Sequence, residues 1–82
     1  MLSIRVRFFA FFREVVGCEW LAIQLPSGSF LSDVKEVLSG RFPNLQGIFE
    51  KSSFALNGEL VDLRMALNMD DEVAVLPPSS GG

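Results

Sequence analysis

The sequence contains no histidine and only one cysteine, Cys18. Ser-His and Cys-His nucleophile pairs and most zinc sites require an imidazole, so most self-contained enzyme chemistry is excluded. One cysteine cannot form an internal disulfide, and a lone thiol without a signal peptide fits the reducing cytoplasm. We therefore expect a cytoplasmic chain without a metal site, inert as a catalyst on its own, on which a partner performs the chemistry.

Basic clusters and long apolar runs are missing as well. Seven Lys and Arg residues are scattered among ten acidic residues, and the formal net charge is -3. Because nucleic-acid binding relies on a basic patch, we expect no nucleic-acid partner. No apolar run approaches the ~20 residues that a membrane-spanning helix needs, so we expect no membrane segment.

Large apolar side chains are abundant for so short a chain. Its 82 residues make one domain, and a domain of this size hides only ~60% of its unfolded surface. Eight Phe and one Trp offset the small size because each buries a large area. Apolar surface that stays exposed would indicate a protein partner.

The first part of the chain alternates with the period of a strand. Residues 2–10 carry apolar side chains at every even position, and residues 19–25 alternate again. These two runs predict an antiparallel pair of half-buried strands. Between them, residues 11–16 lose the period of two and Gly17 follows, which predicts a short helical turn closed by glycine.

One main helix is predicted next. Residues 26–28, Pro-Ser-Gly, indicate a turn, and Ser29 is a favourable N-cap. Four apolar residues then share one helical stripe, which would pack on the sheet: Phe30, Val34, Val37 and Leu38. We expect Gly40 to end this helix, and residues 43–47 to stay irregular, followed by at most a short turn at 48–50.

The second half predicts three more strands. Asn57-Gly58 tolerates the positive φ values of a type I′ turn, so residues 54–61 read as a tight hairpin. Residues 62–67 would cross over as a loop, and Glu72–Leu76 form the last strand. The order strand, strand, helix, strand, strand, strand predicts an α+β sheet with one main covering helix.

The chain then ends in a distinctive tail. Pro77 and Pro78 lack a backbone N–H and fix φ, so they end the last strand and start a stiff, extended segment. Gly81 and Gly82 have no side chain, which suits a narrow channel and leaves the terminal carboxyl open to attack. From Leu76 to Gly82 the reach is about 20 Å at ~3.3 Å per residue. The alternative is a frayed terminus without a function.

The two ends of the chain resemble a known family, the small, sulfur-carrying subunits of molybdopterin synthase, which are ubiquitin-like β-grasp proteins. The resemblance rests on these segments: Val6-Arg7-Phe8-Phe9-Ala10, Arg13-Glu14-Val15-Val16-Gly17, Ala55-Leu56-Asn57-Gly58, and Asp71 to Gly82. It implies a β-grasp domain at 1–76, with a mixed sheet of four to five strands, and an extended tail at 77–82. It also implies that the first and last strands are parallel neighbours at the sheet centre.

The resemblance assigns the chemistry to the terminus. Similar proteins are adenylated at the terminal glycine by an ATP-using activating enzyme of the E1 type, and sulfur then replaces the adenylate. By this analogy, Gly82 becomes a thiocarboxylate and enters the large subunit of molybdopterin synthase, which transfers the sulfur to a pterin precursor. Gly81 would be the slender neighbour, and Pro77 and Pro78 would aim the tail. The implied assembly is a heterotetramer of two small and two large subunits.

Other functions share the same tail. A sulfur carrier for thiamine synthesis or tRNA thiolation, or a ubiquitin-like modifier that joins Gly82 to lysines, would need the same glycines. A plain β-grasp interaction module with a passive tail is a further alternative, and this module would keep its function without Gly81 and Gly82.

Several other residues are candidates for partner contacts. Phe8 and Phe9 are adjacent in a strand and cannot face the same core, so Phe9 is a candidate interface residue. Phe11 and Phe12 are weaker candidates for an interface, because Phe side chains usually pack in the core. Cys18 is interpreted as a filler thiol, since no cation or histidine beside it lowers its pKa.

The acidic residues 70–72 precede the last strand. They could steer the tail towards a basic partner, but a solvated turn is favoured because acidic residues are common in turns. Similar proteins usually carry Gly where Asp70 stands. Asp can adopt a left-handed backbone conformation at this position, at some cost in free energy.

Overall fold

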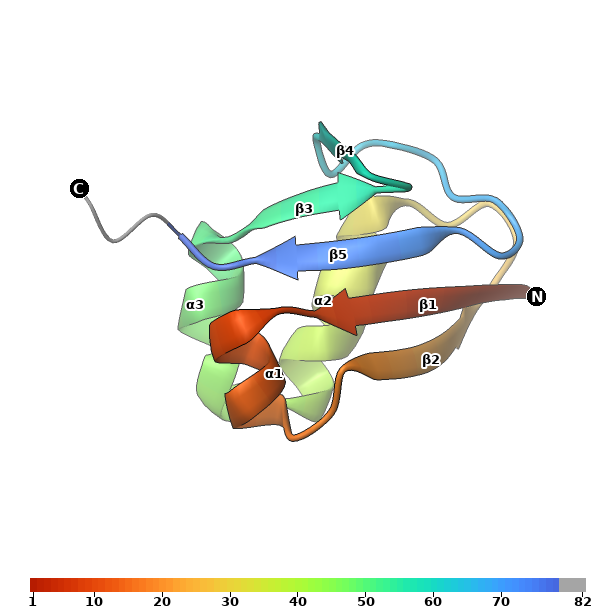
Figure 1. Cartoon of the computed structure of the whole chain (residues 1–82). Coiled ribbons are helices and arrows are strands. Elements are labelled where there is room, and N and C mark those ends of the chain that lie inside the picture. The colour runs from red at the N-terminus through yellow and green to blue at the C-terminus, as the bar shows by residue number, and fades with distance from the viewer. Residues whose placement is uncertain (79–82) are drawn as a thin grey trace.

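The computed structural model describes residues 1–78. This part of the chain contains both helices and strands (Figure 1), which confirms the predicted α+β class. The elements are β1 (Leu2–Phe8), α1 (Ala10–Val16), β2 (Trp20–Leu25), α2 (Leu31–Arg41), the 3-10 turn η1 (Pro43–Leu45), α3 (Gln46–Lys51), β3 (Ser53–Leu56), β4 (Glu59–Val61) and β5 (Glu72–Leu76).

The strands form one five-stranded sheet in the order β2-β1-β5-β3-β4. β1 and β5 run parallel, in a register that aligns Arg5 with Glu72 and Phe8 with Val75, whereas the other neighbours are antiparallel. The last strand is therefore hydrogen-bonded on both sides, at the centre of a mixed sheet. This topology confirms the β-grasp fold, which strand alternation alone could not give.

Alternate residues of the sheet face the core. The even residues of β1 and both valines of β5 point towards α2, and most of them are fully buried. Burying one such side chain contributes about 1.5–3 kcal/mol. The largest fully buried side chains of the core are Ile4, Val6, Phe8, Phe12, Ile23, Leu31, Val34, Leu38, Phe49, Val73 and Val75.

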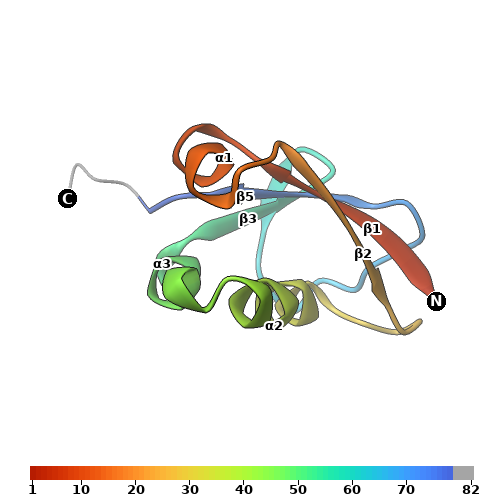
Figure 2. The same cartoon turned by 90° about the horizontal axis from the view of Figure 1, so that it is seen from below.

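The helices α2 and α3 lie along the same face of the sheet (Figure 2). α2 is the main covering helix, with 11 residues, and α3 adds six more. α1 follows β1 at the end of the sheet, and its Phe12 ring stacks on Phe49 of α3 at a centroid distance of 5.3 Å. This contact joins α1 to α3.

The start of α2 differs from the prediction. Ser29 is not the N-cap, because its hydroxyl donates to the carbonyl of Pro26 at 2.7 Å. Phe30 occupies the N-cap position, and its N–H donates to the Asp33 carboxylate at 2.7 Å. Phe30 is 47% exposed, whereas Leu31 is buried. The apolar stripe therefore starts one residue later than predicted.

A distant loop explains this shift. The first two N–H groups of the helix, from Leu31 and Ser32, donate to the carbonyls of Met65 and Leu63, each at 2.9 Å. These N–H groups have no partner inside a helix and are usually satisfied by a cap. Here the crossover loop supplies the acceptors, so no serine hydroxyl is needed.

Gly40 was predicted to end the main helix and Gly47 to lie in an irregular stretch, but both glycines lie inside helices. α2 continues through Gly40 to Arg41, and Gly47 is part of α3. Neither glycine has a positive φ, so neither acts as a helix C-cap. Pro43 instead begins η1, where its missing N–H is no loss. The stretch predicted to be irregular is therefore largely helical.

The first strand is shorter than predicted. β1 ends at Phe8, and Ala10 is exposed at the start of α1 with a φ of 45°. The short helix itself is confirmed, as is its closure by glycine. Gly17 has a φ of 90°, and its N–H donates to the carbonyl of Arg13 at 3.0 Å.

The hairpin is confirmed at the predicted residues. Asn57 and Gly58 have φ values of 50° and 90°, as a type I′ turn requires, and they connect β3 to β4.

In the loop that follows, the Asp62 carboxylate accepts the N–H of Arg64 at 2.7 Å. This hydrogen bond lowers the pKa of Asp62. Among residues 1–78, no helix is long and apolar enough to cross a membrane.

Candidate functional site

The candidate site is the C-terminal tail and the strand that carries it. The predicted reactive residue, Gly82, and its neighbour Gly81 lie outside the described residues. The structure shows the base of the tail: β5, followed by Pro77 and Pro78.

β5 gives the tail a rigid base. Its backbone pairs with β1 on one side and with β3 on the other, and Val73 and Val75 are fully buried. A strand bonded on both sides and packed by two valines opens only with the core of the domain. The direction in which the chain leaves the sheet at Leu76 is thus fixed by the fold.

The N-terminal end of β5 is held by hydrogen bonds. The carboxylate of Asp71 accepts from the Asn57 side chain at 2.9 Å and from the N–H of Asn68 at 2.7 Å. Asn57 also accepts the N–H of Glu72 at 3.0 Å. Asp71 is only 7% exposed, so the prediction of a solvated acidic turn is wrong for this residue. Its side chain joins the hairpin turn to the last strand.

Asp70 is exposed and has a φ of 66°. Its backbone is therefore left-handed, the conformation that glycine adopts most easily. The N–H of Asp70 donates to the carbonyl of Ser3 at 3.0 Å, which ties this turn to β1.

The C-terminal end of β5 lacks such bonds. Pro77 and Pro78 are exposed and follow the strand directly, as predicted. Neither has an N–H, so the sheet ladder cannot continue through them. Pro78 stands four residues before Gly82, which is a reach of about 13 Å at ~3.3 Å per residue.

Phe9 lies beside the strand that anchors the tail, and its ring is 36% exposed. The strand register places three further apolar side chains on the same outer face of the sheet: Trp20, Leu60 and Leu76. Trp20 and Leu60 are exposed, and Leu76 is half-buried. We call these four residues the outer-face patch. Its partner-binding role stays a prediction, but exposed aromatics of this kind are enriched at interfaces.

Two arginines cover part of this patch. The Arg7 guanidinium lies 4.6 Å from the centroid of the Phe9 ring and 5.0 Å from that of Trp20, and Arg5 lies 4.7 Å from Trp20. Arg7 also pairs with the Glu19 carboxylate at 3.2 Å. Each cation–π contact contributes about 0.5–1 kcal/mol at an exposed site. The positive charges and the aromatic rings therefore hold one another in place.

Sequence reasoning missed this arrangement, although a signal was available. Arg5, Arg7 and Phe9 alternate with buried residues, so they share the outer side of β1. The antiparallel register then places Trp20 opposite Arg7. An arginine–aromatic cluster could have been predicted once that pairing was known.

The other residues considered in the sequence differ in their burial. Phe12 belongs to the core, whereas Phe11, the preceding residue, is 41% exposed. Cys18 is a free thiol that packs against the edge of the core, in keeping with a filler role. Arg13 and Glu14 are both exposed, and within residues 1–78 they form no ion pair with each other. No group of metal-ligating side chains occurs in the described part of the chain.

A mixed sheet with parallel central strands, clasping one main helix, defines the ubiquitin-like β-grasp class. The chain belongs to the ThiS family, whose model matches residues 6–82.

Three relatives illustrate the range of the similarity. The molybdopterin synthase sulfur carrier subunit of Chlamydomonas reinhardtii is 36% identical, covering 99% of this chain and 100% of the relative. Small archaeal modifier protein 1 from Methanosarcina acetivorans has a TM-score of 0.80 at 26% identity, covering 100% of this chain and 98% of that one. A complex of subunits 1 and 2 of the molybdopterin-converting factor from Helicobacter pylori contains a chain that matches with a TM-score of 0.71 at 27% identity. The match covers 99% of this chain and 100% of that one. The resemblance inferred from the sequence is confirmed.

Proposed function

We propose that this chain is the sulfur-carrier subunit of a molybdopterin synthase. The observation that carries the proposal is a tail ending in two glycines on the central strand of a β-grasp domain, in a chain similar over its full length to such a subunit. The chain donates sulfur but performs no catalysis alone. The catalytic groups belong to its partners.

The chemistry begins with activation of the terminal carboxylate, which is a poor acyl donor because of its charge. An E1-like activating enzyme uses ATP: the Gly82 carboxylate attacks the α-phosphorus, and pyrophosphate leaves. A sulfide nucleophile then displaces AMP from the acyl-adenylate and forms the thiocarboxylate. ATP is thus consumed by the partner, and this chain binds no cofactor of its own.

The sulfur is delivered in the second stage. The thiocarboxylate enters the large subunit of the synthase, and its sulfur attacks a carbon of the pterin precursor. The carbon–sulfur bond forms as a carbon–oxygen bond at that carbon breaks, and the oxygen group leaves with the electron pair. Water hydrolyses the acyl–sulfur bond, so that the sulfur stays on the acceptor and the Gly82 carboxylate is restored. A complex with a large subunit is supported by the Helicobacter pylori relative. We further propose a heterotetramer of two small and two large subunits, in the cytoplasm where ATP is available.

The residues of this chain contribute binding and position. β5 holds the base of the tail, Pro77 and Pro78 aim it, and Gly81 lets it pass through a narrow channel. Phe9, at the edge of the outer-face patch, contacts the partner. Contacts away from the reacting atoms can supply the binding energy that positions Gly82 at the reaction site.

A second candidate function is a ubiquitin-like modifier, which the similarity to a small archaeal modifier protein favours. The Gly82 adenylate would then be attacked by a lysine amine instead of sulfide, giving an isopeptide bond. A sulfur carrier for thiamine synthesis or tRNA thiolation would form the same thiocarboxylate and differ only in the acceptor. A passive interaction module would form neither product.

The test is the intact mass of the chain after incubation with ATP, sulfide and the activating enzyme of the same organism. We expect a mass gain equal to the exchange of one oxygen for sulfur. A chain without Gly81 and Gly82 serves as the control and should not change. If the full chain gains no mass while the enzyme charges another carrier, the sulfur-carrier proposal is wrong. Transfer to a pterin precursor by the large subunit then distinguishes the pathways.

A further inference from the structure

An apolar hollow opens at the base of the tail. Its volume is about 380 Å³, and it is lined by Phe11 of α1, Ile48 of α3, and Pro77 and Pro78. Figure 2 shows the end of β5 passing between α1 on one side and α3 on the other. Three separate parts of the chain therefore build this feature around the segment that leads to Gly82.

The walls of the hollow are rigid. Phe11 packs edge-on against Phe12 at a centroid distance of 5.4 Å, and Phe12 stacks on Phe49 of α3 at 5.3 Å. Both inner rings are fully buried, so the two helices are fixed relative to each other. On the other side, the pyrrolidine rings of Pro77 and Pro78 fix φ. The hollow is thus formed before any partner binds, which lowers the entropy cost of filling it.

The lining of the hollow favours binding of an apolar side chain. None of the four lining residues carries a charge, and a charged group placed there would lose hydration without gaining a partner. Phe11 is 41% exposed although its ring continues the aromatic stack of the core. Aromatic residues are enriched at interfaces, and the residues that carry most binding energy cluster in pockets that exclude water.

The hollow lies close to the tail, and this position indicates which protein supplies the apolar side chain. Pro78 lies four residues before Gly82, so a protein that encloses the terminal glycine comes within about 13 Å of the hollow at ~3.3 Å per residue. This argument rests on the proposed function. The large subunit holds the thiocarboxylate during sulfur transfer, and a related small subunit has been solved in complex with its subunit 2.

We propose that the hollow receives an apolar side chain of the large subunit, next to the entrance of the channel that accepts the tail. The hollow and the tail then form one continuous contact surface. The inserted side chain fixes the base of the tail while the glycines reach the reaction site. Phe11 and Ile48 are binding residues in this interaction and do not touch the reacting atoms.

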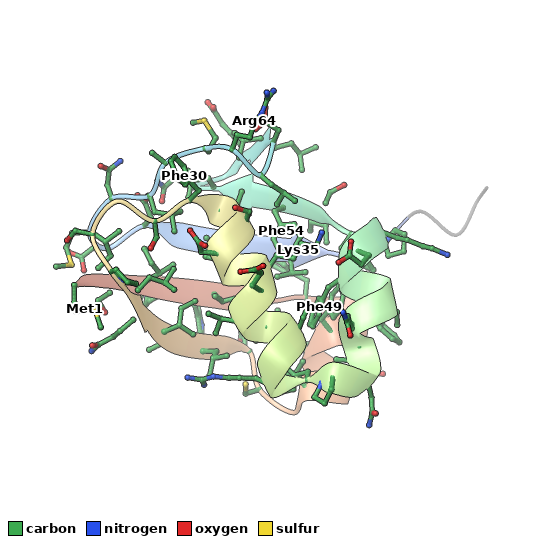
Figure 3. All side chains as sticks on the ribbon, turned by 180° about the vertical axis from the view of Figure 1, so that it is seen from behind. Met1, Phe30, Lys35, Phe49, Phe54 and Arg64 are labelled. Atoms are coloured by element: carbon green, nitrogen blue, oxygen red, sulfur yellow. The ribbon has the colours of Figure 1, made fainter. Side chains whose placement is uncertain are left out.

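The experiment measures binding of the purified large subunit of the same organism by calorimetry. We expect Phe11→Ala and Ile48→Ala each to weaken binding by at least about tenfold, as for interface anchors. Phe30→Ala is the matched control. Phe30 is 47% exposed and lies at the start of α2, away from α3 and its Phe49 (Figure 3). This variant should bind within about twofold of the wild type, as is usual for substitutions outside an interface.

Further measurements separate the possible outcomes. Thermal unfolding checks that each variant is folded, and Phe11→Leu, which keeps an apolar side chain, should recover most of the affinity even if Phe11→Ala is unstable. Equal binding of the wild type, Phe11→Leu and the alanine variants would overturn the hollow as a contact site and leave the proposed function intact. Loss of binding only towards the activating enzyme would overturn the choice of partner. If the wild type gains no sulfur and does not bind the large subunit, both proposals fail.

Discussion

The two ends of β5 are built in opposite ways. At its N-terminal end, Asp71 is buried and accepts two hydrogen bonds, from the Asn57 side chain and from the N–H of Asn68. At its C-terminal end, Pro77 and Pro78 are exposed and have no N–H to donate. One end is fixed by polar contacts within the domain, whereas the other presents an apolar, donor-free surface.

The N-terminal end of β5 therefore stabilises the fold, whereas its C-terminal end is available for binding a partner. Because the N-terminal end and the buried valines hold β5 in the sheet, the C-terminal end needs no internal contacts to stay in place. Its surface remains free for a partner. Substitutions at the bonded end should therefore change the free energy of unfolding, and substitutions at the proline end should change binding and transfer.

The largest effect on stability is expected for Asp71→Ala. The substitution leaves the Asn57 amide and the Asn68 N–H without their acceptor, and a buried donor without a partner costs about 1–3 kcal/mol. Chemical denaturation measures the change. Glu72→Ala is the matched control, since its carboxylate accepts no hydrogen bond among the described residues. We expect this control to stay within about 0.5 kcal/mol, and an equal loss in both variants would contradict the special role of the bonded end.

A smaller effect, with the opposite sign, is expected for Asp70→Gly. The φ of 66° at Asp70 is strained for a residue with a Cβ and free for glycine, so the substitution should stabilise the domain by up to about 1 kcal/mol. Asp70→Ala keeps the Cβ but loses the polar side chain, and it should be less stable than the wild type. Thermal unfolding of the three proteins should give the order Gly, Asp, Ala. A wild type more stable than Asp70→Gly would show that the Asp side chain stabilises the turn by more than the positive φ costs, and an Asp70→Ala variant more stable than the wild type would show that the side chain contributes nothing.

The smallest effect on stability is expected for the double variant Pro77→Ala/Pro78→Ala. Both residues are exposed beyond the last strand, so the free energy of unfolding should change by less than about 0.5 kcal/mol. The tail gains conformational freedom, which must be lost on binding. Affinity for the large subunit should fall several-fold. Pro43→Ala removes an exposed proline from η1, away from the tail, and should change neither binding nor sulfur transfer.

Features that depend on neighbouring residues were predictable from the sequence. Asn57-Gly58 determines a type I′ turn by its own backbone preferences, and the hairpin forms at the predicted residues. The strand Glu72–Leu76 and its end at Pro77 follow equally from local rules. The tail, as a candidate site, needed no knowledge of the fold.

Features that depend on distant contacts were not predictable. Ser29 has the right side chain for an N-cap, but the carbonyls of Met65 and Leu63 satisfy the first N–H groups of α2 instead. Nothing in the sequence around residue 29 indicates that these carbonyls are close. The hollow is a similar case, because Phe11, Ile48 and Pro77 meet only once α1, α3 and β5 have packed together. Parallel pairing of the terminal strands came from family resemblance, since alternation does not encode strand order.

The parallel pairing of β1 and β5 has a mechanical consequence. Because the two strands point the same way, the start of β1 and the end of β5 lie at opposite ends of the sheet (Figure 1). A pulling force applied between the two termini therefore loads the hydrogen bonds between these strands in shear. Shear distributes the load over the whole ladder from Arg5–Glu72 to Phe8–Val75, instead of opening one bond after another. Tension transmitted through the tail would thus be shared by the whole β1–β5 ladder.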